Sequence, residues 1–231
     1  MEELGLSPEN LILLDRLIQR PHGIIFVTGP TGSGKTTTLY ACLARIHIEE
    51  RKIITLEDPI EYQISGITQI QINPMIGFGF AQGLRFILRH DPNIMMVGEV
   101  RDNETATIAI QVALTGHLVF SPLHTNDAAS GITRLLDMGI KAYLIASSVQ
   151  CFIAQRLIRL VCPQCKTPCK VTSEILQEFA VEGQEASKLM IYEGKGCEAC
   201  NFTGYRGQQG IYEFLIVNDL IRDMIMARAT A

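Results

Sequence analysis

At 231 residues the chain exceeds one typical domain of about 150 residues but falls short of two, which predicts one large core with a smaller attachment. Hydrophobic residues make up 47% and charged residues 19%, which excludes a fibrous or wholly disordered chain. The net charge of −4 gives no global basic field for nucleic acid, and no apolar run reaches the length of a membrane span.

The first elements of the chain are a helix and a buried strand. The acidic start Met1-Glu2-Glu3-Leu4 lacks the pattern of a secretory signal, so we expect a soluble, cytoplasmic protein without direct membrane insertion. Ser7-Pro8-Glu9 is typical of a helix N-terminus, because Ser accepts a free N–H and Pro suits the first position. The apolar run Ile24–Val27 then predicts a strand that leads into a glycine-rich turn.

Strands and helices alternate through the next hundred residues. Further strands are predicted at Ile53–Leu56, Ile94–Val97 and Leu118–Phe120. The helices between them are predicted at Thr36–Ile48, Phe80–Leu88 and Thr105–Thr115. This alternation predicts an α/β fold with a mainly parallel sheet.

Beyond Asn126 the pattern predicts helices in place of strands. They are expected at Ala128–Met138, Ala142–Leu160, Thr172–Ala186 and Asn218–Ala227, with an irregular, glycine-rich stretch from Gly194 to Gly210. We predict a core at residues 1–160, a cysteine-bearing subdomain at 161–214 and the start of a C-terminal helical region at 215–231.

The turn after the first strand carries a phosphate-binding motif. It matches G-x-x-x-x-G-K-[ST] and reads Gly29, Pro30, Thr31, Gly32, Ser33, Gly34, Lys35 and Thr36, with Thr37 next to it. Glycines let backbone N–H groups surround phosphate oxygens, Lys35 reaches the outer phosphates and the Thr36 hydroxyl binds Mg²⁺. The alternative is a tight turn without a ligand, which does not need the Lys-Thr pair. The motif therefore predicts a nucleotide and Mg²⁺ as ligands.

Acidic residues follow two of the predicted strands. Glu57, Asp58 and Glu61 follow the strand at 53–56, and Glu99 follows the strand at 94–97. Because ligands of open α/β sheets lie at the carboxyl ends of strands, we expect these carboxylates to face the phosphates. One can hold the shell of the metal ion and another can orient the attacking water. The alternative for each is an ordinary solvated charge.

Histidines and arginines complete the candidate site. His117 and His124 bracket the strand at 118–120, where a nucleotide sensor is plausible for His124, although lone histidines more often serve packing or surface roles. Arg85, Arg89 and Arg101 are candidates for stabilising transition-state charge, in the same chain or in a neighbouring one, the alternative being surface arginines.

Four cysteines form a metal-binding pattern. Cys162, Cys165, Cys197 and Cys200 make two C-x-x-C pairs, and four thiolates suit a tetrahedral Zn²⁺ ion. A closed four-sulfur site leaves no position for water, so we expect a structural zinc ion. The alternative is a catalytic redox pair, which needs only one C-x-x-C.

Four segments resemble the secretion ATPases, the superfamily of type II secretion and type IV pilus assembly motors. They are Gly29–Tyr40, Thr55–Glu61, Val97–Asp102 and Thr115–Phe120, which are similar to that family's Walker A motif, Asp box, Walker B motif and His box. The resemblance runs from about Leu4 to Asp219, and the four cysteines resemble the type II secretion and pilus-extension branch.

The resemblance implies a P-loop NTPase core of the RecA type and a role for each site residue. Lys35 and Thr36 would bind phosphate and Mg²⁺, Glu61 would polarise water and Glu99 would act at the metal. His117 and His124 would contact or sense the nucleotide, and the three arginines would be arginine-finger candidates.

From these features we predict an ATP-hydrolysing motor domain. The resemblance implies a homohexameric ring that works on an inner-membrane secretion or pilus platform and its cytoplasmic adaptor, at the inner membrane of a bacterium. Family members usually carry further N-terminal domains and a longer C-terminus; for a fragment we expect nucleotide binding with slow hydrolysis. The alternatives are a DNA-translocating motor and a regulatory subunit that binds nucleotide with negligible turnover; we expect no nucleic acid partner.

Overall fold

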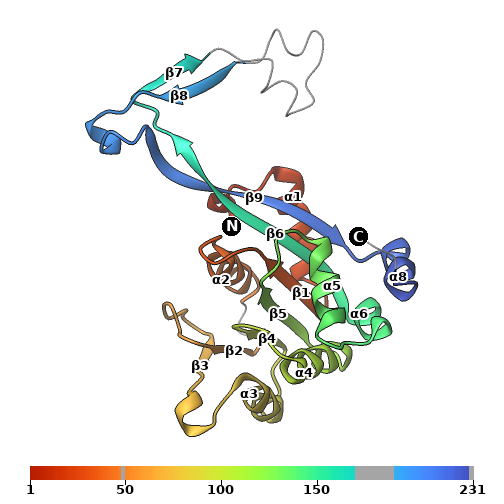
Figure 1. Cartoon of the computed structure of the whole chain (residues 1–231). Coiled ribbons are helices and arrows are strands. Elements are labelled where there is room, and N and C mark those ends of the chain that lie inside the picture. Colours follow the sequence, from red (N-terminus) through yellow and green to blue (C-terminus); the bar gives the residue numbers. More distant parts are fainter. Residues whose placement is uncertain (48–49, 170–189, 229–231) are drawn as a thin grey trace. The chain divides into compact units, whose positions relative to one another are not determined.

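The computed structural model describes residues 1–47, 50–169 and 190–228 (Figure 1). The helix predicted at Thr172–Ala186 lies outside the described residues. The chain forms two compact units, one made of Met1–Arg156 and Gly210–Ala231, the other of Leu157–Gln209. We call them unit 1 and unit 2. The predicted boundaries at residues 160 and 214 fall inside two strands, β6 and β9, through which the chain passes from one unit to the other.

The large sheet has seven strands in the order β3-β2-β4-β5-β1-β6-β9. Their bounds are β1 Gly23–Thr28, β2 Ile53–Glu57, β3 Thr68–Gln71, β4 Ile94–Val97, β5 Leu118–Leu123, β6 Val149–Val161 and β9 Tyr205–Ile216. The central pairs β2/β4, β4/β5, β5/β1 and β1/β6 are all parallel, as is β2/β3. The predicted α/β fold with a mainly parallel sheet is therefore confirmed.

Helices follow most strands of this sheet. Their bounds are α1 Pro8–Ile18, α2 Lys35–Ile46, α3 Phe80–Ile87, α4 Asn103–Leu114, α5 Ala129–Asp137, α6 Ala142–Ser148 and α8 Asp219–Met226. Short 3₁₀ turns lie at Glu2–Leu4, Pro74–Ile76, Leu88–His90 and Glu198–Cys200. The predicted start of the first helix is confirmed, because the Ser7 hydroxyl accepts the Asn10 N–H at 3.2 Å. None of the helices in the described part of the chain is long and apolar enough to span a membrane.

Strand β1 is buried on both faces, and successive residues pack into different apolar clusters. Ile24 and Phe26 belong to a cluster that also takes in side chains of α3, α4 and α6. Ile25 and Val27 belong to a second cluster, formed with α1 and α2. Helices on both faces of a parallel sheet explain why its strands read as continuous apolar runs.

The predicted helix at Ala142–Leu160 is wrong beyond Ser148. The chain there forms β6, whose first seven residues, Val149–Gln155, are all buried. A strand buried on both faces shows no alternation of polar and apolar residues, so periodicity alone does not distinguish it from a buried helix. The stretch after Gly204, predicted as irregular, is strand β9, and the short edge strand β3 was not predicted.

Unit 2 contains little apolar burial. Strands β7, Lys166–Cys169, and β8, Ile191–Gly194, form a two-stranded antiparallel sheet. Among its described residues the buried apolar side chains are those of Cys162 and Cys200. Two cation–π contacts lie on its surface, between Arg159 and the Tyr205 ring at 4.1 Å and between Lys166 and the Tyr192 ring at 3.8 Å.

Candidate functional site

The phosphate-binding motif forms the loop between β1 and α2. Gly29, Gly32 and Gly34 have φ of 147°, 78° and 85°, a region that residues with a side chain rarely adopt. At Gly29 a Cβ atom would also lie only 2.5 Å from the backbone oxygen of Gln155 in β6. The glycines of the motif are therefore required by the path of the loop.

Two polar side chains of this loop are buried. Lys35 Nζ donates to the carbonyl oxygens of Gly29 at 2.9 Å and Pro30 at 2.8 Å, and burial lowers the pKa of Lys35. Ser33 Oγ is buried and has no hydrogen-bond partner. An unsatisfied buried hydroxyl in a native structure needs an explanation, and here it lies in a loop whose N–H groups and lysine suit phosphate oxygens. The residues present therefore fit a nucleotide phosphate.

Glu99 and the acidic segment after β2 lie at neighbouring strand ends. Strands β2 and β4 pair in parallel with Leu56 opposite Val97, and the Gly98 N–H donates to the Leu56 carbonyl at 2.6 Å. These carboxyl ends are on the same edge of the sheet as the end of β1, where the phosphate-binding loop begins. A cleft of about 530 Å³ is lined here by Asp58, Ile72, Pro74, Gly77, Gly79, Phe80, Ala81, Gln82, Arg85, Glu99, Arg101, Asp102, Glu104 and Thr105.

His124 joins this group of charged residues. It follows the last residue of β5, and partial burial lowers its pKa. The positive charges of Lys35 and Arg101 lower the pKa of His124 further, while Glu99 acts in the opposite direction. The structure therefore brings Lys35, Glu99, Arg101 and His124 together at one edge of the sheet.

His117 lies at the opposite edge of the sheet. It precedes the first residue of β5, where its carbonyl accepts the N–H of Gly23 at the start of β1. Its Nδ1 is 3.2 Å from both the Val112 carbonyl and the Thr115 hydroxyl. Six strand residues at about 3.3 Å each separate it from the phosphate-binding loop, roughly 20 Å. The expected contact of His117 with a nucleotide is therefore not met within one chain.

Glu57 is buried and its carboxylate is already bonded. It accepts hydrogen bonds from the Thr55 hydroxyl at 2.5 Å, from Gln69 Nε2 at 3.0 Å and from the Tyr40 hydroxyl. Because both carboxylate oxygens are engaged, Glu57 is better suited to anchoring α2 than to binding the cofactor. Its position at a strand end had instead predicted a carboxylate that faces the phosphates. Tyr40 and Gln69 were not singled out in the sequence; the only signal is a tyrosine on the buried face of the helix after the phosphate motif.

The other predicted acids are at the surface. Asp58 and Glu61 are exposed, in the loop between β2 and β3, and Asp58 lines the cleft. Thr36 and Thr37 lie in the first turn of α2, with Thr36 half-buried and Thr37 exposed. These side chains are open to a ligand that approaches from solvent.

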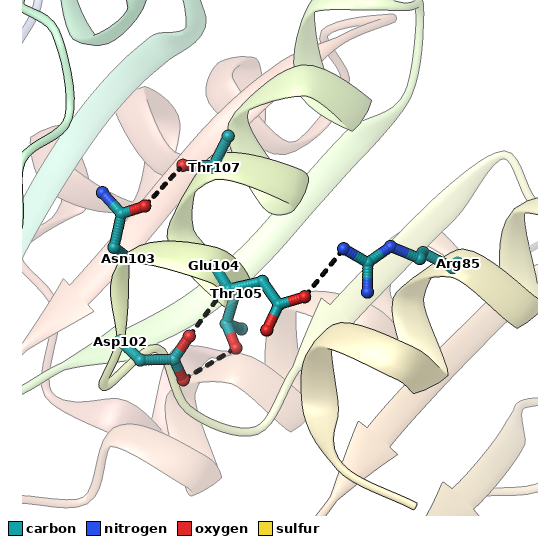
Figure 2. A network of polar contacts seen from close by, with 6 residues as sticks. All are labelled: Arg85, Asp102, Asn103, Glu104, Thr105 and Thr107. Carbon is teal, nitrogen blue, oxygen red and sulfur yellow. Dashed lines mark hydrogen bonds and ion pairs between the residues drawn. The ribbon is translucent and has the colours of Figure 1, made fainter.

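The three arginines differ in their surroundings. Figure 2 shows the guanidinium of Arg85, on α3, reaching Glu104 on α4 at 2.8 Å. Arg101 pairs with Glu99 at 2.5 Å, and both Arg85 and Arg101 line the cleft. Arg89 is exposed in the turn Leu88–His90 and is not among the residues that line the cleft.

The start of α4 closes the cleft beside Arg85. Asp102 caps this helix by accepting the N–H of Thr105 at 2.8 Å and the hydroxyl of Thr105 at 2.9 Å (Figure 2). The same view shows Asn103 and Thr107 in contact one turn apart, at 3.5 Å. The N-terminal turn of α4 is therefore fixed by side chains of its own first residues.

The four cysteines of unit 2 converge on one point. Their sulfur atoms all lie within 4.8 Å of one another, with 3.9 Å for Cys162 and Cys197, 3.9 Å for Cys165 and Cys200, and 3.8 Å for Cys197 and Cys200. A tetrahedral ion with metal–sulfur bonds of about 2.3 Å requires sulfur–sulfur distances of about 3.8 Å. The cluster therefore has the dimensions of a four-thiolate metal site.

Backbone groups support charged sulfur in this cluster. The N–H groups of Cys197 and Gly204 lie 3.2 and 3.3 Å from the sulfur of Cys200, and that of Gly196 lies 3.3 Å from the sulfur of Cys165. Burial acts to raise the pKa of Cys200, but the Cys197 and Gly204 N–H groups together with the thiols of Cys197 and Cys165 outweigh it and lower the pKa to about 6. Burial raises the pKa of Cys165 to about 11, and the Gly196 N–H acts in the opposite direction. Donors of this kind stabilise the thiolates that a zinc ion needs.

Comparisons with known proteins identify the family of the chain. The family model described as "Type II/IV secretion system protein" matches residues 1–231. The type II secretion system ATPase E of Vibrio cholerae is 52% identical over 229 residues, 99% of this chain and 45% of that protein. The type IV pilus assembly ATPase PilB of Thermus thermophilus is 46% identical over 231 residues, all of this chain and 26% of that protein.

A solved structure shares the fold. The crystal structure of the pilus retraction motor PilT with bound ADP has a TM-score of 0.67 and 31% sequence identity, covering 98% of this chain and 55% of that chain. The chain spans less than half the length of the curated relatives described above.

Proposed function

The chain belongs to the type II/IV secretion system protein family, and from this premise we propose that it is an ATP-hydrolysing motor domain for type II secretion or type IV pilus assembly. One observation carries the proposal: the phosphate-binding loop lies with Glu99 and His124 at the carboxyl ends of the strands. The Ser33 hydroxyl of this loop is buried and unpartnered. The ADP bound to the related motor PilT supports the same assignment of the nucleotide.

In this proposal each residue of the site acts at a defined point of the reaction. The loop N–H groups and Lys35 would hold the outer phosphates, and Thr36 and Glu99 would hold Mg²⁺, whose positive charge would be supplied to the phosphate oxygens. Glu61 orients a water molecule and takes its proton as the water oxygen bonds to the γ-phosphorus. The bond from that phosphorus to the bridging oxygen breaks, and ADP leaves with the electron pair. His124 senses the γ-phosphate.

We propose that the active form is a homohexameric ring in which an arginine acts on a neighbouring nucleotide. Arg85 and Arg101 line the cleft but are held by Glu104 and Glu99 in this chain. Both guanidinium groups are exposed, and ion pairs at the surface contribute only about 0 to 1 kcal/mol each, so a phosphate can displace the acid without a large cost.

The proposed setting is the cytoplasmic side of a bacterial inner membrane. There the ring would do mechanical work on a secretion or pilus platform and bind its cytoplasmic adaptor, in line with the names of the related proteins. We further propose that Cys162, Cys165, Cys197 and Cys200 hold a structural zinc ion, because the sulfur distances match a closed four-thiolate site.

The test is Mg²⁺-dependent ATP hydrolysis as a function of protein concentration. Glu61→Gln is expected to lower turnover by about 10² to 10⁴, the usual contribution of a positioned acid–base group. Lys35→Ala is expected to lower it by about 10² to 10³, as for the loss of one group that stabilises transition-state charge. Glu50→Gln, a matched change in an exposed turn, is the control and leaves turnover intact. Turnover unaffected by both variants contradicts the proposal; binding without turnover at every concentration favours a regulatory subunit, and stimulation by DNA favours a translocase.

A mixing experiment tests the arginine in trans. Lys35→Ala chains and Arg101→Ala chains are each inactive alone in this proposal. Mixed together, they place an intact phosphate site beside an intact arginine at some subunit boundaries, so part of the turnover returns. The same experiment with Arg85→Ala identifies which of the two arginines acts. No recovery with either variant contradicts action between subunits.

A further inference from the structure

The loop that carries Glu61 connects β2 to β3 along the surface of unit 1. It runs from Asp58 to Ile67, and the Glu61 side chain within it is exposed. A residue that must orient a water molecule needs a fixed position, because a displacement of about 1 Å can cost 10²-fold in rate. The position of Glu61 therefore depends on what holds the backbone of this loop.

The side chain of Gln69, at the start of β3, binds this loop at two points. Its Oε1 accepts the Ile64 N–H at 2.7 Å, and its Nε2 lies 3.2 Å from the Tyr62 carbonyl. The same Nε2 is 3.0 Å from the carboxylate of Glu57, at the end of β2. One amide therefore ties the loop to both strands between which it runs.

Tyr40 ties the same loop to α2. Its ring is buried and meets the Tyr62 ring edge to face, with centroids 4.7 Å apart and an angle of 81°. Its hydroxyl donates to Glu57 and lies 3.4 Å from Gln69 Nε2. Burial raises the pKa of Tyr40, and Glu57 raises it further, while a hydrogen bond from the Glu61 backbone acts in the opposite direction. The Tyr40 ring therefore holds the loop at Tyr62, the residue next to Glu61.

Helix α2 also begins with Lys35 and Thr36, the residues assigned to phosphate and metal. Tyr40 lies four residues after Thr36, about one helical turn of 5.4 Å along a rigid element. The contacts of Tyr40 and Gln69 therefore connect the phosphate-binding end of α2 with the loop that carries the water-orienting acid. Glu57 is the buried acceptor shared by both side chains.

We propose that Tyr40 and Gln69 are positioning residues for ATP hydrolysis, which with Glu57 clamp the loop of Glu61 onto the helix of Lys35 and Thr36. This inference rests on the proposed role of Glu61. In this proposal Glu57 holds Tyr40 and Gln69 in place and does not bind nucleotide or metal. The clamp sets the distance between the water and the γ-phosphate, so its loss lowers the rate of the chemical step and leaves nucleotide binding intact.

The first test compares two tyrosine variants in steady-state hydrolysis. Tyr40→Phe removes the hydroxyl of the clamp, and we expect kcat to fall about 10- to 100-fold with an unchanged ATP KM and an unchanged affinity for ADP. Tyr212→Phe is the matched control, because its half-buried hydroxyl donates to the Leu4 carbonyl at 3.0 Å, outside the clamp. Gln69→Asn and Gln71→Asn form a second pair on the same strand, of which only the first lowers kcat. Equal effects within each pair overturn the proposal.

The second test separates positioning from a general loss of stability. In the double variant Tyr40→Phe with Glu61→Gln, turnover equals that of Glu61→Gln alone if Tyr40 acts through Glu61. Multiplied losses overturn the proposal. Turnover that survives Glu61→Gln by itself contradicts instead the proposed role of Glu61.

Amide hydrogen exchange provides a readout that does not depend on turnover. Tyr40→Phe and Gln69→Asn are expected to speed exchange in a peptide covering residues 58–67, while a peptide covering β1 keeps its protection. Tyr212→Phe leaves both peptides unchanged. Unchanged exchange of residues 58–67 in Tyr40→Phe overturns the clamp, whatever the measured turnover.

Discussion

Unit 1 and unit 2 differ in what stabilises the fold of each unit. Unit 1 has an apolar cluster on each face of its sheet, and its phosphate-binding loop rests on strands that are buried on both faces. Unit 2, in the part that the structure describes, buries the side chains of Cys162 and Cys200 and exposes most of the others. From this difference we infer that ligands would play opposite parts in the two units: a nucleotide would bind to a fold that is already stable, whereas a metal ion at the four cysteines would supply the stability of the fold.

The largest expected effect is the loss of the metal site in unit 2. Cys200→Ser removes one of four ligands, and structural zinc sites carry apparent binding free energies of about 10 to 16 kcal/mol. We expect the zinc content to fall and amide exchange to become fast at the described residues of unit 2, while unit 1 keeps its urea midpoint. Cys42→Ala, a buried cysteine of α2, is the control that retains zinc. Slow exchange in unit 2 without metal contradicts the comparison.

The next effect is a cavity in the core of unit 1. Phe26 is fully buried on β1 and stacks on Phe152 with ring centroids 5.5 Å apart. Phe26→Ala is expected to lower the free energy of unfolding of unit 1 by about 3 to 5 kcal/mol. Urea unfolding measures this loss, and zinc stoichiometry is expected to stay unchanged. A parallel loss of zinc would show that the two units do not differ in the way described.

A smaller effect is expected at the helix cap beside the cleft. Asp102→Ala leaves the Thr105 N–H without its side-chain acceptor, which costs about 1 kcal/mol of stability. Asp102→Asn keeps an acceptor oxygen and is expected to retain most of the stability that the cap contributes. Thermal or urea unfolding of the two variants makes the comparison, and equal losses would contradict the capping role.

The smallest effect is a pH dependence from His124. Its pKa is lowered from 6.5, so the unfolded chain binds the proton at a higher pH than the native one. Stability is therefore lost as pH falls from the ordinary pKa towards the lowered native value. His124→Gln removes this contribution, and the difference between urea midpoints at about pH 7.5 and about pH 5.5 is expected to shrink. A larger difference in the variant would reverse the assigned direction of the shift.

The strands that are followed by a recognisable motif were predicted from the sequence. The chemistry of the phosphate loop, the acidic strand ends and the cysteine pairs fixes their residue types and spacing. The strands that precede the phosphate loop and the acidic residues were therefore predicted together with these motifs. Strand β6 has no such marker, and burial on both faces removes the alternation that identifies a strand. Strand β3 is short and half-exposed, so its pattern is equally weak.

The candidate site was predicted only in part, because the argument from strand ends places some residues correctly and misses contacts made in the fold. Position at a strand end places Glu99 and His124 near the loop, but the same argument was applied to His117, which is at the start of its strand. Glu57 lies at a strand end and is nevertheless saturated by Tyr40 and Gln69, one from a helix and one from a strand beyond the loop. Contacts between residues distant in the sequence leave no periodic signal, so only the fold reveals them.

The internal bonds of Lys35 have a consequence for selectivity. Its ammonium group donates to two carbonyl oxygens of its own loop, those of Gly29 and Pro30. The ammonium group has a third N–H donor for an anion, and a stronger hold requires that the anion replace one of these two neutral acceptors by offering more negative charge at the same distance. A polyphosphate chain satisfies this condition along several loop N–H groups at once, whereas a chloride ion meets it at one point. The resting contacts of the lysine thus favour a polyphosphate over an anion that meets the loop at a single point.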